Sequence, residues 1–301
     1  MKIASAVLIL VVCLTSSMEA QITASERQNL DDIFGTTGEY VTPEGTYRLS
    51  FPRIDAKVMV DNQLLSSFLG LESWAAFTSD PHHGGALLTA ELVLLEDEVN
   101  PVLSVALDRN LAVTAIANHY LFEKPRVIFM QVSGLGEPAA LATKVQELRE
   151  KIKAIRTANP KPSTQFSGPN LPSRQKSNIS APVLDSILGT HGQTVDGMYK
   201  ASMGMAGTIF GVPAGKQTGL MTWIAFAGSD GNAVMNGQIV MTSSQVHDVL
   251  HALRQAGINI TSLHNHFIDS NPDFYFVHYW GNGGAVQLAK GIRRAMETQL
   301  K

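Results

Sequence analysis

Apolar and polar side chains alternate along parts of this chain, and elsewhere apolar residues recur at helical spacing. The alternation predicts strands over Tyr47–Phe51 and Asp55–Val60. In Val246–Ala256, apolar residues three and four positions apart predict a helix, which Gly257 ends. Further strands are predicted over Trp74–Phe77, Ala86–Leu95, Leu111–Tyr120, Arg126–Val132, Ile258–Phe267 and Phe274–Tyr279. Further helices are predicted over Ser25–Phe34, Asn100–Asn110, Pro138–Ile155, Val183–Leu188 and Ala285–Leu300.

This order of elements occurs twice, and so does part of the sequence itself. Asn118-His119-Tyr120 reappears 147 residues later as Asn265-His266-Phe267. Likewise, the segment around Trp74 corresponds to the segment around Trp223. Two copies with so long a period indicate an internal duplication and not a solenoid, whose units have roughly 20–50 residues.

The duplication predicts an α+β protein built from two similar units. Each unit is expected to follow the approximate order ββββ-α-ββ-α with an antiparallel sheet, and the two to pack about a pseudo-two-fold axis. We assign repeat 1 to residues 21–155 and repeat 2 to residues 183–301. Residues 156–182 contain five prolines among polar residues, which is typical of a linker.

The N-terminus has the pattern of an export signal. Met1-Lys2 precedes the apolar run Ile3–Leu14, so residues 1–20 are predicted to be a signal peptide that is cleaved after Ala20. The protein is therefore expected to be periplasmic or secreted. The alternative is a lipoprotein anchored through Cys13, the only cysteine, although Val12 departs from the lipobox pattern. We expect membrane association only in that alternative.

The charge balance limits the choice of partners. A net charge of −3 at pH 7 gives no basic surface, which argues against a nucleic-acid partner. A small molecule or another protein of the cell envelope is the expected partner.

Three histidines of repeat 2 have the spacing of a metal site. His264 and His266 are two positions apart on a predicted strand, so their side chains point to one face. His278 lies on the next strand and joins them if an even register pairs the two strands. Imidazoles placed in this way are common ligands of divalent transition metals. The alternative is that they only hydrogen-bond within a half-buried face.

Repeat 1 has lost most of this set but has an acidic cluster that repeat 2 lacks. Ala117, His119 and Gln131 stand at the matching positions. Glu96, Asp97 and Glu98 precede the predicted central helix, where Asp97 is a good N-cap, as is Ser244 in repeat 2. One interpretation is a composite site to which Glu96, Glu98 and His119 contribute across the repeats. The other is that neither copy is complete.

These motifs carry a family resemblance. The run Ile258–His266, with Pro272 and Phe276–Gly281, resembles the LppY/LpqO proteins, also called DUF1259. Leu95–Val102 extends the resemblance into repeat 1, so that it covers essentially the whole mature chain. The resemblance implies two such repeats behind an export signal in proteins named as lipoproteins, and it implies no established activity. The chain departs from the family pattern at Ala117 and Gln131.

Two hypotheses follow for the function. The first is an exported protein with a metal or small-ligand site centred on His264, His266 and His278, whose cofactor is a divalent transition metal; no catalytic residue is assigned. The second is a non-catalytic envelope binding or structural protein with a degenerate site, in which a sheet face including Trp74 and Trp223 holds a partner.

Overall fold

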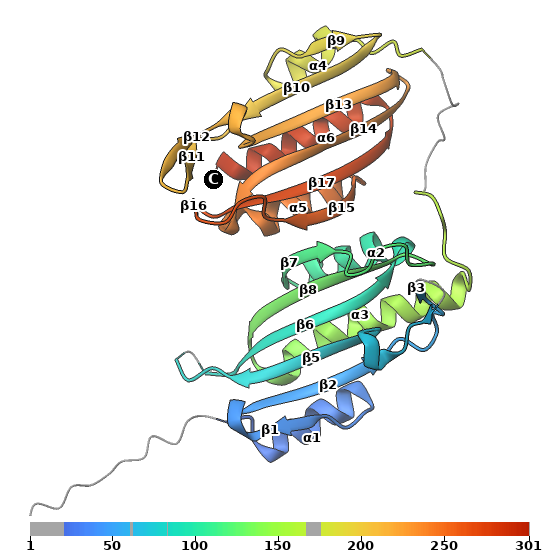
Figure 1. Ribbon diagram of the computed structural model, residues 1–301, viewed down its shortest axis with the longest axis vertical. Coiled ribbons are helices and arrows are strands. Elements are labelled where there is room, and N and C mark those ends of the chain that lie inside the picture. Colours follow the sequence, from blue (N-terminus) through green and yellow to red (C-terminus); the bar gives the residue numbers. More distant parts are fainter. Residues whose placement is uncertain (1–20, 61–62, 83, 167–175, 301) are drawn as a thin grey trace, which may run out of the picture.

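The computed structural model describes residues 21–60, 63–82, 84–166 and 176–300. The predicted signal peptide and Cys13 lie outside these residues. The described part of the chain is an α+β protein with six α-helices and a long antiparallel sheet (Figure 1). None of its helices has the length and apolar content needed to span a membrane.

Repeat 1 begins with a helix that packs beside its last helix. The elements are α1 (Ala24–Phe34), β1 (Glu39–Val41), β2 (Thr46–Pro52), β3 (Met59–Val60), β4 (Gln63–Leu64), β5 (Glu72–Ser79), β6 (Ala86–Leu95), α2 (Glu96–Asp108), β7 (Ala112–Ala117), β8 (Val127–Gly136) and α3 (Pro138–Ala158).

Repeat 2 has the same order of elements, with one additional short strand. The elements are α4 (Ala181–Leu188), β9 (Gln193–Val195), β10 (Met198–Gly204), β11 (Gly207–Ile209), β12 (Val212–Ala214), β13 (Met221–Ser229), β14 (Asn232–Thr242), α5 (Val246–Gln255), β15 (Asn259–His264), β16 (Ser270–Asn271), β17 (Phe274–Gly283) and α6 (Ala285–Glu297). Short 3₁₀ turns occur at Thr42–Glu44, Ser67–Leu69, Lys216–Thr218, Ser243–Gln245 and Thr298–Leu300.

Two local predictions were wrong. Only the last two residues of the predicted strand Asp55–Val60 form a strand. Arg53 donates to the buried carboxylate of Glu98 at 2.6 and 2.7 Å, so the chain turns out of the sheet after Pro52. The second wrong prediction made Asp97 and Ser244 the N-caps of the central helices. Because α2 begins at Glu96 and α5 at Val246, neither residue occupies the capping position.

The two repeats share one twelve-stranded sheet. Its order is β1-β2-β5-β6-β8-β7-β15-β17-β14-β13-β10-β9, which places matching strands at equal distances from the β7–β15 junction. There, Ile116 lies opposite Leu263 in an antiparallel pair. These two residues are counterparts 147 positions apart. A residue paired with its own counterpart is the mark of a two-fold axis, as in isologous interfaces.

Helices reinforce this junction on the core side. The buried Asn100 of α2 accepts a hydrogen bond from the N–H of Ile260 at 2.7 Å and donates to its carbonyl at 3.1 Å. From α5, Arg254 donates to the hydroxyl of Ser104 at 3.0 Å. One hydrophobic core includes buried residues of all six helices and of the sheet face beneath them. The core is therefore continuous across the two repeats.

Candidate metal centre

The register between β15 and β17 decides where the three histidines point. Ser262 lies opposite His278, and His264 lies opposite Phe276. His278 is therefore two positions from His264 along the pairing, which is the even register that puts both side chains on one face. The neighbours of His278 in β17, Val277 and Tyr279, point to the opposite face and belong to the core beneath the helices. The histidines therefore lie on the face turned away from the helices.

The three imidazoles converge. The Nε2 atoms of His264 and His266 are 3.1 Å apart, and the rings of His264 and His278 have centroids 5.2 Å apart. One ligand nitrogen from each ring lies within 4.8 Å of the other two. Two nitrogens that each lie about 2 Å from a tetrahedral ion are about 3.3 Å apart, so the closest pair already has a suitable separation.

Aromatic packing holds His266 in place. Its ring stacks on Phe276 with centroids 3.6 Å apart and planes 4° from parallel. In repeat 1, His119 stacks on Phe129 in the same way, at 3.6 Å and 8°. The fold thus uses a histidine at this position in both repeats as a packing group. Only in repeat 2 do two further imidazoles surround it.

The surroundings favour neutral imidazoles, which are the form that binds metals. Partial burial, and then the nearby rings of His264 and His278, lower the pKa of His266 to about 4. Burial also lowers the pKa of His264. The pKa of His278 is lowered by burial and by His264. At neutral pH the cluster therefore presents three uncharged nitrogen donors to one point.

The predicted contributors from repeat 1 do not join this cluster. Among the described residues, the cluster contains the three histidines alone. Glu98 is fully buried and forms ion pairs with Arg53 and Arg156, at 2.6 and 2.8 Å. It also accepts a hydrogen bond from the N–H of Leu95 at 2.8 Å. Its position at the start of α2 is thus explained by repeat 1 itself.

The remaining members of the acidic cluster lie near the linker. Asp97 forms an ion pair with Arg156 and accepts a hydrogen bond from the N–H of Ser163 at 2.9 Å. Glu96 lines a small hollow with Asp97 and residues 163–166. Neither carboxylate has a described contact with repeat 2, so the structure gives no composite site with the histidines.

In repeat 1, polar groups replace the histidine cluster. Gln131, the counterpart of His278, donates to Glu91 at 3.0 Å. Ala117, the counterpart of His264, has no ligand atom in its side chain. Sequence reasoning did not single out Glu91 or its counterpart Gln238, which lies opposite His278 on β14. The offset of 147 residues was the signal that could have found them.

The two tryptophans of the second hypothesis lie on the same open face of the sheet. A basic side chain covers each ring: Arg48 lies 4.1 Å from the centre of Trp74, and Lys200 lies 4.7 Å from the centre of Trp223. Such cation–π contacts stabilise a half-exposed ring by about 0.5–1 kcal/mol. A role of this face in holding a partner stays a prediction.

Comparison with known proteins gives a family and no function. No curated protein and no solved structure matches the chain. The sequence profile described as Domain of Unknown Function (DUF1259) matches residues 28–151 and again residues 183–298. These segments coincide with the two sets of structural elements and together span most of the chain. The protein therefore belongs to the DUF1259 family and carries its domain in two copies.

Proposed function

We propose that this is an exported metal-binding protein that holds one divalent transition-metal ion on His264, His266 and His278. The observation that carries the proposal is the convergence of three imidazole nitrogens within 4.8 Å of one another. The lowered pKa values of all three rings support it, because neutral imidazole offers a free lone pair at physiological pH.

The donor set favours a particular kind of ion. Three neutral nitrogens suit zinc, copper or nickel better than magnesium or calcium, which prefer oxygen. Three protein ligands leave a fourth tetrahedral position for water or for an oxygen of a bound molecule. Because no carboxylate belongs to the cluster in the described part of the chain, the proposal is metal binding with one open position, and it assigns no general base.

Metal binding is tested on the full mature protein, without a histidine tag and purified without chelators. We expect about one zinc per chain by elemental analysis, and a four-coordinate visible spectrum after replacement by Co²⁺. His278→Gln introduces the residue that repeat 1 carries at this position. It should weaken Zn²⁺ binding by about tenfold or more.

The matched control is His191→Gln, which makes the same change at an exposed histidine far from the cluster in sequence. It should leave zinc affinity unchanged. Equal zinc affinity in the wild type and in His278→Gln, or a Co²⁺ spectrum that is insensitive to this substitution, would show that the ion is held elsewhere.

A further inference from the structure

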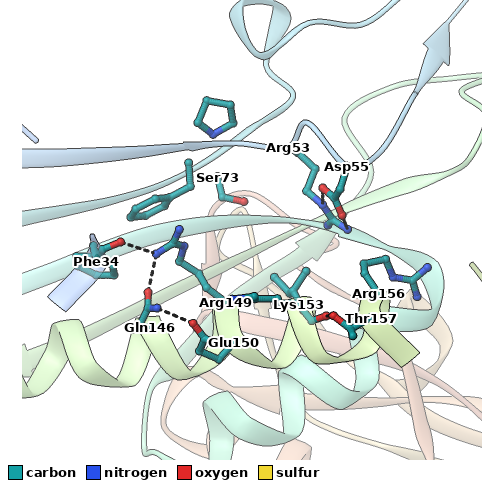
Figure 2. A pocket seen from close by; sticks show the side chains of 13 residues that line it. Phe34, Arg53, Asp55, Ser73, Gln146, Arg149, Glu150, Lys153, Arg156 and Thr157 are labelled. Atoms are coloured by element: carbon teal, nitrogen blue, oxygen red, sulfur yellow. Dashed lines mark hydrogen bonds and ion pairs between the residues drawn. The ribbon is translucent and has the colours of Figure 1, made fainter. Parts of the chain in front are cut away.

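Repeat 1 contains a pocket that the proposed metal centre does not use. It lies between α3 and the strand ends around Phe51 and Ser73, and its cavity volume is about 570 Å³ (Figure 2). This is within the range of roughly 300–1,000 Å³ that is usual for small-molecule sites. Figure 2 shows Arg149 and Lys153 rising from α3 on one side, with Arg53 and Asp55 on the other.

The cations of this pocket are not all neutralised. Arg53 forms ion pairs with Asp55 and Glu98 at 2.7 and 2.6 Å. In contrast, Arg149 is half-buried and its hydrogen bonds go to uncharged groups: it donates to the carbonyl of Phe34 at 3.4 Å and to Oε1 of Gln146 at 2.5 Å.

The carboxylate next to Arg149 in sequence, Glu150, favours the charged form of Arg149 by its own charge but forms no ion pair with it. Glu150 instead accepts a hydrogen bond from Gln146 at 2.9 Å. One turn further along α3, Lys153 lines the same pocket. In the described part of the chain no carboxylate forms an ion pair with either Arg149 or Lys153. The pocket therefore carries two positive charges that no carboxylate pairs directly, although Glu150 also lines it.

Burial makes the charge of Arg149 costly. Its guanidinium carbon lies 3.8 Å from the ring centre of Phe51, and desolvation lowers the pKa of this side chain. A guanidinium nevertheless stays protonated in proteins. An incoming anion would offset the lost hydration, because arginine forms two parallel hydrogen bonds with a carboxylate or phosphate group. Apolar atoms of Phe34, Pro52 and Ile152 complete the walls beside these charges.

Repeat 2 places its cation differently: Arg293 lines the corresponding pocket, donates to the carbonyl of Leu188 at 3.1 Å and forms an ion pair with Glu297 at 2.7 Å. This pocket, with a volume of about 270 Å³, has Met205, Met296 and Leu300 where repeat 1 has Arg53, Arg149 and Lys153. Arg53 and Met205 occupy the same place in the two repeats. The N–H of Arg53 donates to the carbonyl of Leu71, and the N–H of Met205 donates to the carbonyl of Leu220, the counterpart of Leu71. The cation that lines the repeat 2 pocket is thus ion-paired with a carboxylate, whereas Arg149 and Lys153 form no ion pair within the described residues.

We infer that the pocket of repeat 1 binds a small amphiphilic anion, namely a carboxylate or a phosphate monoester attached to a short apolar chain. The anionic group lies between Arg149 and Lys153, and the chain lies against Pro52 and Ile152. The inference is independent of the metal centre, because no residue of the pocket belongs to the histidine cluster.

Calorimetric titrations of the full protein test the inference with four probes: octanoate, octyl phosphate, acetate and 1-octanol. Octanoate or octyl phosphate should bind saturably at one site, and the tighter of the two identifies the head group. Acetate and 1-octanol, which each lack one half of the amphiphile, should bind at least about tenfold more weakly. Binding of 1-octanol as tight as that of octanoate would contradict the role of the charges. Binding of acetate as tight as that of octanoate would contradict the role of the apolar chain.

Two variants locate the site on the chain. Arg149→Met and Lys153→Leu introduce the residues of repeat 2, and each should weaken the tighter probe by about tenfold or more. Lys153 is exposed, so its replacement leaves folding intact even if Arg149→Met does not. The matched control, Lys151→Leu on the same helix, should bind as the wild type does. His278→Gln should also bind the probe normally. Unchanged affinity in both pocket variants overturns the inference.

Discussion

Among single residues, the packing of His266 against Phe276 gives the metal-free protein a pH-dependent stability. The pKa of His266 is about 4 in the folded state, below the usual value of 6.5. Above pH 6.5 neither state binds a proton there. Between pH 6.5 and 4 the unfolded chain takes up a proton that the folded chain does not, so the folded state loses stability as the pH falls.

Urea unfolding in the presence of a chelator measures this effect. His266→Gln removes the titration and the ring stacking, so it should be less stable than the wild type at pH 7. The difference in free energy of unfolding should shrink by pH 4.5, where only the wild type has lost the histidine contribution. Val277→Ala, a core substitution without a titrating group, should keep a constant difference. A constant difference for His266→Gln as well would contradict the lowered pKa.

The buried ion pair between Arg53 and Glu98 makes a second prediction about residues. Removing one member leaves the other with a single ion-pair partner, Arg156 for Glu98 or Asp55 for Arg53, and breaking a buried pair from one side costs up to about 3–5 kcal/mol. Glu98→Gln and Arg53→Met should each destabilise the protein by this order. The double variant reproduces Gln245 and Met205 of repeat 2. It should recover at least about 2 kcal/mol relative to the sum of the single effects.

Repeat 2 also supports the geometry of the double variant. Gln245 accepts a hydrogen bond from the N–H of Thr242 at 2.9 Å, as Glu98 does from the N–H of Leu95 at 2.8 Å. The uncharged amide therefore fills the same role. Chemical denaturation of the four proteins of the cycle gives the coupling energy, and strict additivity would mean that the two residues act independently.

At the scale of elements, the matching strand pairs allow the metal centre to be copied. Gln131 lies opposite Ala115 on β7, and Ala117 lies opposite Phe129, which reproduces the register of the histidine cluster. His119 already stacks on Phe129. Adding Ala117→His and Gln131→His should therefore create a second site, so that the chain binds about two zinc ions and not one.

Elemental analysis and Co²⁺ titration measure this stoichiometry. Ala117→His alone supplies only two imidazoles and should bind a second ion at least about tenfold more weakly than the double variant. If the double variant still bound one ion, the shared strand register would not be sufficient to define the site.

Elements were the part of the fold that the sequence predicted best. The strand Ala86–Leu95 agrees residue for residue with β6, in which alternating burial is followed by a continuous buried run up to the start of α2. The even register of β15 and β17 accounts for the meeting of His264 and His278. His266 was predicted on the same strand, but β15 ends at His264, and its ring is instead placed by stacking on Phe276. The environment of Glu98 could not be predicted, because Arg53 and Arg156 reach it from distant segments. The pocket around Arg149 was missed because helical periodicity treats an arginine as a solvated residue.

For the whole molecule, the shared sheet and continuous core predict that the two repeats unfold together. Trp74 reports on repeat 1, whereas Trp223 and Trp280 report on repeat 2. Trp74→Phe leaves fluorescence from repeat 2 alone, and Trp223→Phe with Trp280→Phe leaves fluorescence from repeat 1 alone. Within each variant, the fluorescence and circular-dichroism transitions in urea should coincide, because one cooperative unit gives one transition for every probe. Separate transitions would mean that the junction couples the repeats weakly.

The position of the junction could not be predicted from the sequence. A pseudo-two-fold axis was expected, but two repeats that pack through their helix faces, or through either edge strand of their sheets, satisfy the same symmetry. The choice of β7 and β15 depends on the buried pair Ile116 and Leu263 and on Asn100, which bonds to the backbone of Ile260. Nothing in the periodicity of these segments distinguishes a strand at an outer edge from one at the centre.

The pairing of Ile116 with Leu263 has a consequence for behaviour on dilution. Two separate chains meeting at such an edge would form a dimer whose stability depends on protein concentration, and they would part when dilute. Here one peptide chain supplies both partners, so the encounter is intramolecular and its effective concentration is fixed by the connecting segment. On dilution the protein keeps its central strand pair, and its unfolding midpoint does not change with concentration.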